Sequence, residues 1–216
     1  MGYAFDFAGL SLQARASGAL WWPKAQTLIV SDLHLGRSIR VARKGIGLLP
    51  PYEVEDTLTR LEAEIAALKP KRLISLGDAF DDMPASQELE PRQAERLRRM
   101  TGQHEWIWIS GNHDPAAHLQ DLGGEVMESW NQSPVFRHIM ALGAPDITGH
   151  MHPVMVIGGR RMRCFVVSGD HLILPAFGAY VGGLDLRDPA FSPWARQGLA
   201  LICGRRVIAA PVPREK

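Results

Sequence analysis

The hydrophobic pattern along the chain changes character near its middle. In the first half, short apolar runs typical of buried strands alternate with longer stretches in which apolar residues recur every three or four positions. Strands are predicted at 27–30, 72–76 and 106–109, and helices at 53–69, where Pro70 ends the pattern, and at 88–100. Alternating strands and helices predict a half built from parallel βαβ units.

The second half, from Val135 onward, consists of short extended runs broken by glycine. Gly158-Gly159 and Gly169-Asp170 predict hairpin turns, so this half is expected to be mainly antiparallel. The sequence contains no internal repeat, low-complexity tract or linker. We therefore expect one domain, residues 1–216, in which two sheets pack together and are covered by helices.

Charge and composition limit the functional classes. The 24 basic and 23 acidic residues leave a net charge of +1, which excludes the overall positive field of an obligate nucleic-acid binder. Any recognition of anions must be local. Arg37, Arg40 and Arg43 recur at helical spacing and share one face, which is either an anion site or a solvated helix face.

Cysteine usage and hydropathy indicate the compartment. Cys164 and Cys203 have no metal-type spacing, and two reduced, buried thiols are favoured over a disulfide. No apolar run reaches the roughly 18 residues of a membrane span, and the N-terminus lacks the pattern of a secretory signal. These features predict a cytoplasmic protein without a membrane partner.

Polar residues follow each of the three predicted parallel strands, in SDLHLG, GDAFDD and SGNHDP. The carboxyl ends of such strands meet at one edge of a sheet, where ligands bind. Side chains expected at this edge are those of Asp32, His34, Asp78, Asn112 and His113. Each motif alone is typical of a turn, but together they supply the carboxylate, amide and imidazole ligands that suit Mn²⁺, Fe²⁺, Co²⁺ or Zn²⁺.

Two further histidines lie in the second half, in DITGHMHP. In an extended segment, alternate side chains leave the same face, so His150 and His152 are expected to converge on one site. The absence of cysteine from all these motifs argues against a structural zinc site.

The order of the motifs resembles that of the calcineurin-like metallophosphoesterases, whose pattern is DxH, GDxxD, GNH[DE], a single His and GHxH. The match runs from Asp32 to His152, and the single histidine maps to His138 in VFRH. The resemblance implies an α/β fold, a four-layer α/β/β/α sandwich of two mixed sheets. It also implies two divalent metal ions: one held by Asp32, His34 and His152, the other by Asn112, His138 and His150, with Asp78 bridging both.

The resemblance also implies the chemistry. Manganese is the metal most expected, and a hydroxide bridging the two ions would attack phosphorus in line. His113, held by Asp114, would contact the phosphate or protonate the leaving oxygen. Arg37, directly after the first motif, is expected to contact a substrate phosphate.

Longer stretches resemble one branch of this superfamily, the bacterial ligase-associated DNA damage response endonucleases or phosphodiesterases. These stretches are LLPPYEVEDTLTRLEAEI, FRH and LPAFGAYVGGLDLRDPAF. The resemblance implies a DNA substrate and a functional link to an ATP-dependent DNA ligase, a helicase and an exonuclease. One departure is Asp81, where that branch is expected to carry histidine; the extra carboxylate is expected to weaken anion binding or alter metal preference, and Asp82 is an alternative for the motif's last Asp.

Two other classes stay open. A phosphomonoesterase or nucleotide phosphodiesterase would use the same ions in a narrower pocket, whereas 216 residues without a capping domain favour an open site suited to a polymer. A metal-stabilised scaffold without activity is the second alternative. The seven ligand candidates and His113 argue against it, because a scaffold has no use for an acid placed at the phosphate.

Overall fold

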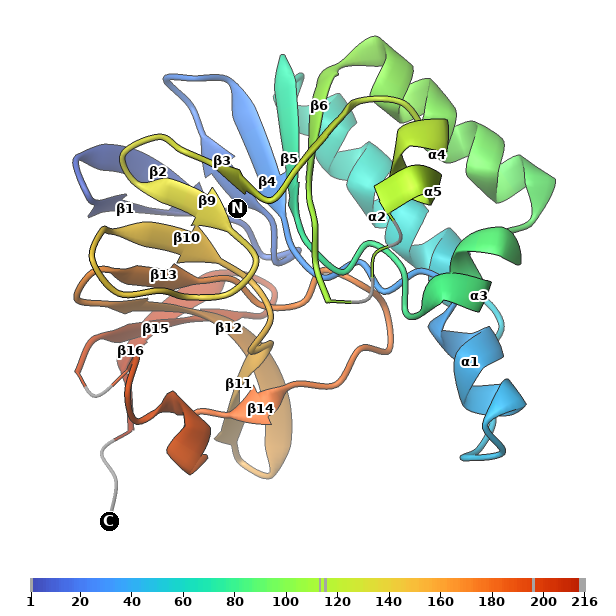
Figure 1. The fold of residues 1–216 in the computed structure, drawn as a ribbon. Helices are drawn as coiled ribbons and strands as arrows, with labels where there is room; N and C mark the ends of the chain where they lie inside the picture. The colour runs from blue at the N-terminus through green and yellow to red at the C-terminus, as the bar shows by residue number, and fades with distance from the viewer. Residues whose placement is uncertain (1, 113, 115, 196, 214–216) are drawn as a thin grey trace.

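The first half of the chain forms a seven-stranded mixed sheet in the computed structural model, which describes residues 2–112, 114, 116–195 and 197–213 (Figure 1). Its strands, in spatial as well as sequence order, are β1 (Tyr3–Phe7), β2 (Leu10–Ala14), β3 (Leu20–Trp22), β4 (Thr27–Val30), β5 (Arg72–Leu76), β6 (Glu105–Ile109) and β7 (Glu125–Met127). The first four strands pair antiparallel, whereas β4 to β7 pair parallel. The predicted βαβ half is therefore confirmed.

The second half forms a nine-stranded mixed sheet. Its strands are β8 (Ser129–Trp130), β9 (Val135–Arg137), β10 (Asp146–Thr148), β11 (Pro153–Ile157), β12 (Arg160–Ser168), β13 (His171–Ile173), β14 (Leu184–Asp185), β15 (Leu199–Cys203) and β16 (Val207–Pro211). The pairs β9–β10, β10–β13 and β11–β14 are parallel, and the other five are antiparallel. Both predicted glycine hairpins are present, between β11 and β12 and between β12 and β13.

The helices lie on the side of the first sheet (Figure 1). They are α1 (Arg37–Arg43), α2 (Glu53–Leu68), α3 (Met83–Gln87), α4 (Pro91–Gln103) and α5 (Ala116–Asp121). Helix α2 ends as predicted before Pro70, with Lys69 in a left-handed conformation. Helix α4 begins at Pro91, because Glu90 and Gln93 form a reciprocal capping box, so it lies three residues later than the pattern predicted.

Burial of every residue in β4 follows from layers on both faces of the sheet. Leu28 and Val30 belong to the core between the sheet and its helices, whereas Ile29 belongs to the core between the two sheets. A third, smaller core covers the outer face of the second sheet, where Phe191 in a 3-10 turn (Pro189–Phe191) packs on Cys164 and its neighbours. The predicted sandwich of two mixed sheets is confirmed, with its second helical layer reduced to this turn in the described residues.

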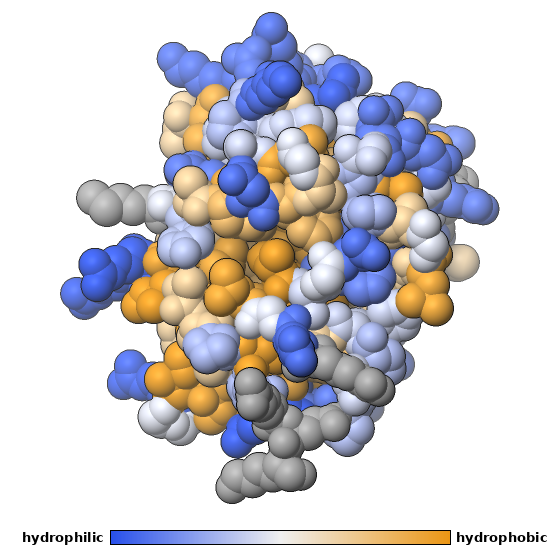
Figure 2. Space-filling model, turned by 90° about the vertical axis from the view of Figure 1, so that its left-hand side faces the viewer, coloured by the Kyte–Doolittle hydropathy of each residue, from blue (hydrophilic) through white to orange (hydrophobic). Residues whose placement is uncertain are grey.

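The structure also shows where the cysteines and the exposed hydrophobic residues lie. Cys164 and Cys203 are both buried and free, as predicted. Hydrophobic residues also gather on the side of the molecule that lies away from the helices (Figure 2). Within the described residues, no helix has the length and apolar character needed to cross a membrane.

Parallel pairing places loops from both sheets at one rim. Because β4, β5 and β6 run in the same direction, the loops after their carboxyl ends lie side by side. In the second sheet, β9 and β10 are also parallel, and their following loops meet this rim. The fold thus brings together segments that are far apart in sequence.

The first turn of α2 contains a buried carboxyl group, that of Glu53. The residue is fully buried, and its Oε2 has no hydrogen-bond partner among the described residues. Burial raises the pKa of Glu53 to about 7, against the hydrogen bonds from Ser38 and Gly36 that lower it. Because this pKa lies above the ordinary 4.5, the folded state is favoured by protonation, and this contribution is lost as the pH rises through about 7.

We expect Glu53→Gln to raise the melting temperature at pH 8.5, where the native carboxylate is charged, and to change it little at pH 5. A shift from 4.5 to about 7 corresponds to at most about 3 kcal/mol, and each kcal/mol is worth about 2 to 4 °C in a chain of this size. Thermal unfolding of both proteins at the two pH values measures the effect. An equal difference at both would contradict it.

Candidate metal centre

Three side chains from opposite sheets form the first cluster of possible metal ligands. Asp32 and His34 follow β4, and His152 immediately precedes β11. One ligand atom of each lies within 4.8 Å of the others. His152 Nε2 is 3.0 Å from Asp32 Oδ1 and 3.3 Å from His34 Nε2. These are the residues that the resemblance assigns to one ion.

A second cluster consists of Asp78, His138 and His150, again within 4.8 Å. His138 Nε2 is 3.5 Å from Asp78 Oδ2 and 3.2 Å from His150 Nδ1. Asp78 follows β5, whereas both histidines come from the loops of the second sheet. The structure therefore brings together three of the four residues expected around the second ion.

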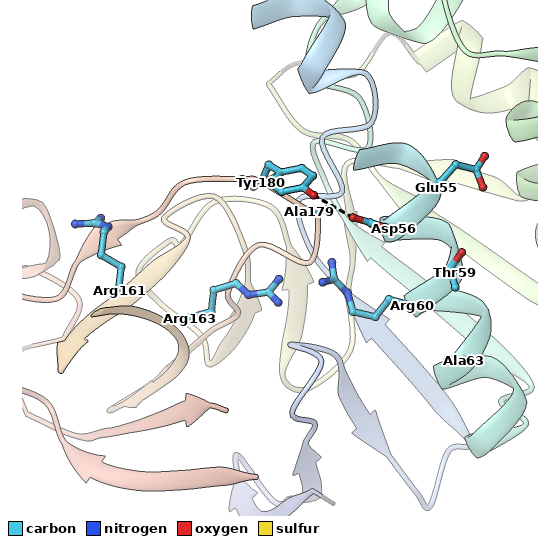
Figure 3. Close-up of a pocket in the computed structure, with 11 residues that line it drawn as sticks. Glu55, Asp56, Thr59, Arg60, Ala63, Arg161, Arg163, Ala179 and Tyr180 are labelled. Atoms are coloured by element: carbon cyan, nitrogen blue, oxygen red, sulfur yellow. Dashed lines mark hydrogen bonds between the residues drawn. The ribbon is translucent and has the colours of Figure 1, made fainter. Parts of the chain in front are cut away.

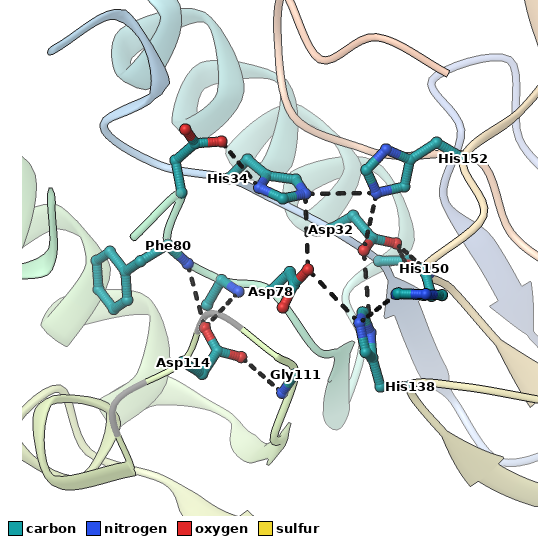
Figure 4. A network of polar contacts seen from close by, with 12 residues as sticks. Asp32, His34, Asp78, Phe80, Gly111, Asp114, His138, His150 and His152 are labelled. Atoms are coloured by element: carbon teal, nitrogen blue, oxygen red, sulfur yellow. Dashed lines mark hydrogen bonds and ion pairs between the residues drawn. The ribbon is translucent and has the colours of Figure 1, made fainter. Parts of the chain in front are cut away.

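The two clusters adjoin, and Asp78 lies between them (Figure 4). Asp78 Oδ2 is 3.9 Å from His34 Nε2 of the first cluster, and Asp32 Oδ1 is 3.9 Å from His138 Nδ1 of the second. A carboxylate in this position is placed to serve both clusters. This agrees with the bridging role expected for Asp78.

The donor set fits divalent cations. Asp32 Oδ2 accepts hydrogen bonds from Ser31 Oγ and from the His150 backbone N–H, whereas its buried Oδ1 faces His152 Nε2 at 3.0 Å. Buried carboxylate oxygens that face imidazole nitrogens are costly unless a cation or proton compensates their charge. Imidazole and carboxylate ligands without thiolates suit Mn²⁺, Fe²⁺, Co²⁺ or Zn²⁺.

The orientation of His138 also fits a ligand role. Its Nδ1 lies 2.9 Å from the Leu76 carbonyl oxygen, which can only accept, so Nδ1 carries the proton and donates. In the neutral ring, Nε2 is then a lone-pair donor directed at Asp78 and His150. Backbone carbonyls commonly orient metal-binding histidines in this way.

Electrostatics within the clusters favour positive charge. Burial alone would lower the pKa of His138, but Asp78 and Asp32 raise it to about 9. Burial would raise the pKa of Asp32, yet hydrogen bonding and the charges of His152 and His138 lower it. Burial and the neighbouring His138 lower the pKa of His150. The carboxylates thus create a site that attracts cations.

The backbone around the clusters is left-handed at five candidate ligands. Positive φ angles occur at Asp32, His34, Asp78, His150 and His152. The expectation of an extended segment at His150 and His152 is wrong, because their φ angles are 66° and 45°. The two side chains nevertheless converge on the adjoining clusters, one in each, as the resemblance implies. Left-handed non-glycine residues are uncommon and concentrate at functional sites.

Asp81 lies directly behind the first cluster. This fully buried carboxylate is 3.0 Å from His34 Nδ1 and 2.9 Å from the guanidinium nitrogens of both Arg37 and Arg40. Burial would raise the pKa of Asp81, but hydrogen bonds from His34 and Arg40 and the charge of Arg37 hold it well below its usual range. Asp81 therefore orients a ligand, and its charge is compensated locally.

The basic face of α1 is accordingly occupied by carboxylates. Arg43 pairs with Asp82 at 2.6 Å and with Glu88 at 2.8 Å. Asp82 also caps α3 by accepting from the Ala85 N–H. The face is thus neither a free anion site nor merely solvated, and Asp82 is not in either cluster. Arg37 contacts Asp81, and its contact with a substrate phosphate stays a prediction.

Gly111, Asn112 and Asp114 of the GNHD motif follow β6. Asp114 accepts hydrogen bonds from the backbone N–H groups of Gly111, Ala79 and Phe80, at 3.0, 2.8 and 3.2 Å. Burial raises the pKa of Asp114 despite these bonds. Asp114 is thereby tied to the loop of Asp78.

Two further predicted residues belong to this motif. Asn112 is exposed, and it follows Gly111, where a β-carbon would lie 2.2 Å from the Asp78 carboxylate and N–H. Its role as a ligand stays a prediction. His113, the predicted acid, lies outside the described residues.

The comparison with known families decides what the clusters are. The model of the calcineurin-like phosphoesterases matches residues 25–178, a range that contains both clusters. The chain belongs to the calcineurin-like phosphoesterase family. It is therefore a metal-dependent phosphoesterase, and this family is dinuclear, in agreement with two adjoining clusters.

Solved structures include similar proteins. The nuclease MPE of Pseudomonas putida is 27% identical, with a TM-score of 0.77, and the match covers 97% of this chain and 100% of that chain. This similarity fits the ligase-associated branch of the calcineurin-like phosphoesterases. The phosphoesterase Yfce of E. coli is 14% identical, with a TM-score of 0.42, over 81% of this chain and 87% of that one. No curated protein sequence matches the chain significantly.

Sequence reasoning did not find the residues that support the ligands of this phosphoesterase. Ser31 holds Asp32, and the Leu76 carbonyl holds His138. Both lie at the ends of buried apolar strands, where the sequence pattern indicates only core residues. The departure at Asp81 was visible in the motif, yet its contact with His34 was not. A polar residue at the end of an apolar strand, as at Ser31, is the signal that was available.

We expect Asp81→Asn to weaken metal binding at the first cluster about 10- to 100-fold, because the His34 ring loses its charged partner. Competition titration of Mn²⁺ against a chelating dye measures the affinity. Asp82→Asn is the matched control, since Asp82 caps α3 and does not contact His34. Equal affinities in the two variants would refute the supporting role of Asp81.

We expect Gly149→Ala to reduce turnover about 100-fold, the order of loss that follows displacement of a site by about 1 Å. The new β-carbon would lie 1.8 Å from Ser31 Oγ and 2.4 Å from Asp32 Oδ2. Gly182→Ala, which meets no atom within 4 Å, is the control. Hydrolysis of a small aryl phosphate ester measures both, and unchanged turnover in Gly149→Ala would contradict the close approach.

Proposed function

We propose that this phosphoesterase hydrolyses phosphodiester bonds in DNA, as a manganese-dependent nuclease. The observation that carries the proposal is the pair of adjoining clusters, with Asp78 between them, in a chain similar over 97% of its length to a nuclease. Two bound divalent ions lower the pKa of a water molecule and offset the charge of a phosphate.

The residues of the chain divide this work. Asp32 and Asp78 contribute the two negative charges within the clusters, and four histidines complete the protein ligands described above. Arg37 and Arg40 compensate the charge of Asp81, so this residue does not repel an anionic substrate. We therefore propose that the extra carboxylate does not weaken anion binding, and its effect on metal preference stays a prediction.

Asn112 and His113 act at the edge of the site in this proposal. Three hydrogen bonds to Asp114 tie this residue to Gly111 and to the loop of Asp78. Asn112 supplies an amide oxygen to the second ion, and His113 donates a proton to the leaving oxygen. Arg37 would contact the substrate phosphate through a charge-assisted hydrogen bond.

The wider setting is also a proposal. Similarity to a nuclease and the motifs of the ligase-associated branch support a role in DNA repair, linked to an ATP-dependent DNA ligase, a helicase and an exonuclease. The two reduced cysteines are consistent with work in the cytoplasm.

The deciding experiment is Mn²⁺-dependent hydrolysis of a chromogenic phosphodiester beside the corresponding monoester. We expect diester turnover that disappears in Asp78→Ala, because both clusters lose a ligand, and that persists in His104→Ala, a histidine outside both clusters. DNA cleavage is then tested with the same variants. Turnover of the monoester alone would indicate a small-molecule phosphatase, and two bound ions without turnover would indicate a scaffold.

A second variant separates metal binding from chemistry. We expect His113→Ala to retain both ions and to lose about 10²- to 10⁴-fold in turnover, the usual contribution of a general acid. Metal content and turnover are measured on the same sample. Loss of metal in His113→Ala, or turnover equal to that of the native protein, would contradict the assignment.

A further inference from the structure

A pocket of about 680 Å³ lies between α2 and β12, outside both metal clusters. Three arginines contribute to its lining: Arg60 from α2, and Arg161 and Arg163 from β12. Figure 3 shows the guanidinium groups of Arg60 and Arg163 pointing toward each other across the pocket. Tyr180, 45% exposed, stands at its edge.

The described hydrogen bonds of these arginines end on backbone carbonyls. Arg60 and Arg163 both donate to the Phe177 oxygen, and Arg163 also donates to the Ala176 oxygen at 3.1 Å. Arg161 donates to the Gly183 oxygen. Elsewhere in the described chain, arginines such as Arg15, Arg72 and Arg96 pair with carboxylates. The pocket arginines therefore donate their hydrogen bonds to carbonyl oxygens, whereas those other arginines donate to carboxylates.

Two guanidinium groups that converge on one carbonyl repel each other. Burial and the charge of Arg163 lower the pKa of Arg60 to about 10, and burial lowers that of Arg163. The Nε of Arg60 is buried without a hydrogen-bond partner among the described residues. Partly buried charge of one sign is unfavourable unless an opposite charge accompanies it.

The carboxylates at the pocket do not balance this charge. Glu55 pairs with Arg96. Asp56 accepts a hydrogen bond from the Tyr180 hydroxyl at 3.3 Å, and its charge raises the pKa of Arg60. Because Arg96 is shared between Glu55 and Glu62, we count the three arginines of the lining against both Glu55 and Asp56, and a net charge of about +1 remains for a ligand.

We propose that this pocket is an oxyanion site that binds a phosphate group between Arg60 and Arg163, with Arg161 at its rim. Guanidinium groups match phosphate geometry and bind it through charge-assisted hydrogen bonds. The volume admits a ligand as large as a mononucleotide. Phosphate binding here does not depend on DNA being the substrate of the metal centre.

The segment 176–180 connects this pocket with the metal centre. Its carbonyls accept from Arg60 and Arg163, while the N–H groups of Phe177 and Gly178 donate to the carbonyls of Ser31 and Asp32 at 2.7 and 3.1 Å. A phosphate in the pocket would draw the arginines away from these carbonyls. The site thus has a direct mechanical path to the backbone of Asp32.

Isothermal titration of inorganic phosphate into the full-length, metal-loaded protein tests the site. We expect a binding event that is retained in Asp78→Ala, which disables the metal centre, and weakened at least tenfold in Arg163→Gln. Arg187→Gln, an exposed arginine paired with Asp185, is the matched control and is expected to bind as the native protein does. Equal phosphate affinity in the native protein and Arg163→Gln would overturn the proposal.

A second variant guards against misfolding of Arg163→Gln, which is checked by circular dichroism. Arg161 bonds only to the Gly183 oxygen in the described residues, so Arg161→Gln leaves the 176–180 segment intact. We expect it to weaken phosphate binding severalfold, and unchanged affinity there would also count against the site. Competition by a single-stranded oligonucleotide would identify a nucleic-acid backbone as the source of the phosphate, whereas binding without competition would identify the free ion.

Discussion

The close approach of two sheets at one rim is the constraint on which the metal centre depends. At Gly149, a β-carbon would overlap Ser31 and Asp32, and at Gly77 it would lie 2.2 Å from His138 Nδ1. These two glycines lie at the points where loops from opposite sheets touch. With any side chain there, the carboxylates of the first sheet and the imidazoles of the second would stand too far apart to share ions.

The close approach of the two sheets is unfavourable by itself, because it buries carboxylates and requires left-handed backbone conformations. A left-handed conformation costs a residue other than glycine about 1 to 2 kcal/mol, and five candidate ligands adopt it. The compensation is distributed: Ser31 and a backbone N–H hold one oxygen of Asp32, Leu76 holds His138, and Asp81 holds His34. Bound cations would offset the remaining negative charge of the carboxylates. The strained backbone and the metal ligands are therefore parts of the same site.

The sequence was sufficient for the features that depend on local pattern. Strands β4, β5 and β6 and helix α2 lie within one residue of their predicted positions, because their apolar periodicity is strong and Pro70 marks a stop. The contacts between residues far apart in the chain could not be predicted from the sequence. The spacing of Arg37 and Arg40 shows a shared face but not that Asp81 occupies it, and alternation could not reveal that His150 and His152 leave a left-handed turn in different directions.

The origin of the ligands has a consequence for folding. Asp32 accepts a hydrogen bond from the backbone N–H of His150, which lies 118 residues later in the chain. Each cluster likewise combines residues from both sheets. During synthesis, a chain that has completed the first sheet contains the carboxylate ligands. It still lacks the histidine ligands that the second sheet contributes. Contacts of such long sequence separation form late, so we expect tight metal loading only once both halves have docked. Metal retention would then report that folding is finished, and a half-folded chain would be unable to cut any phosphate ester.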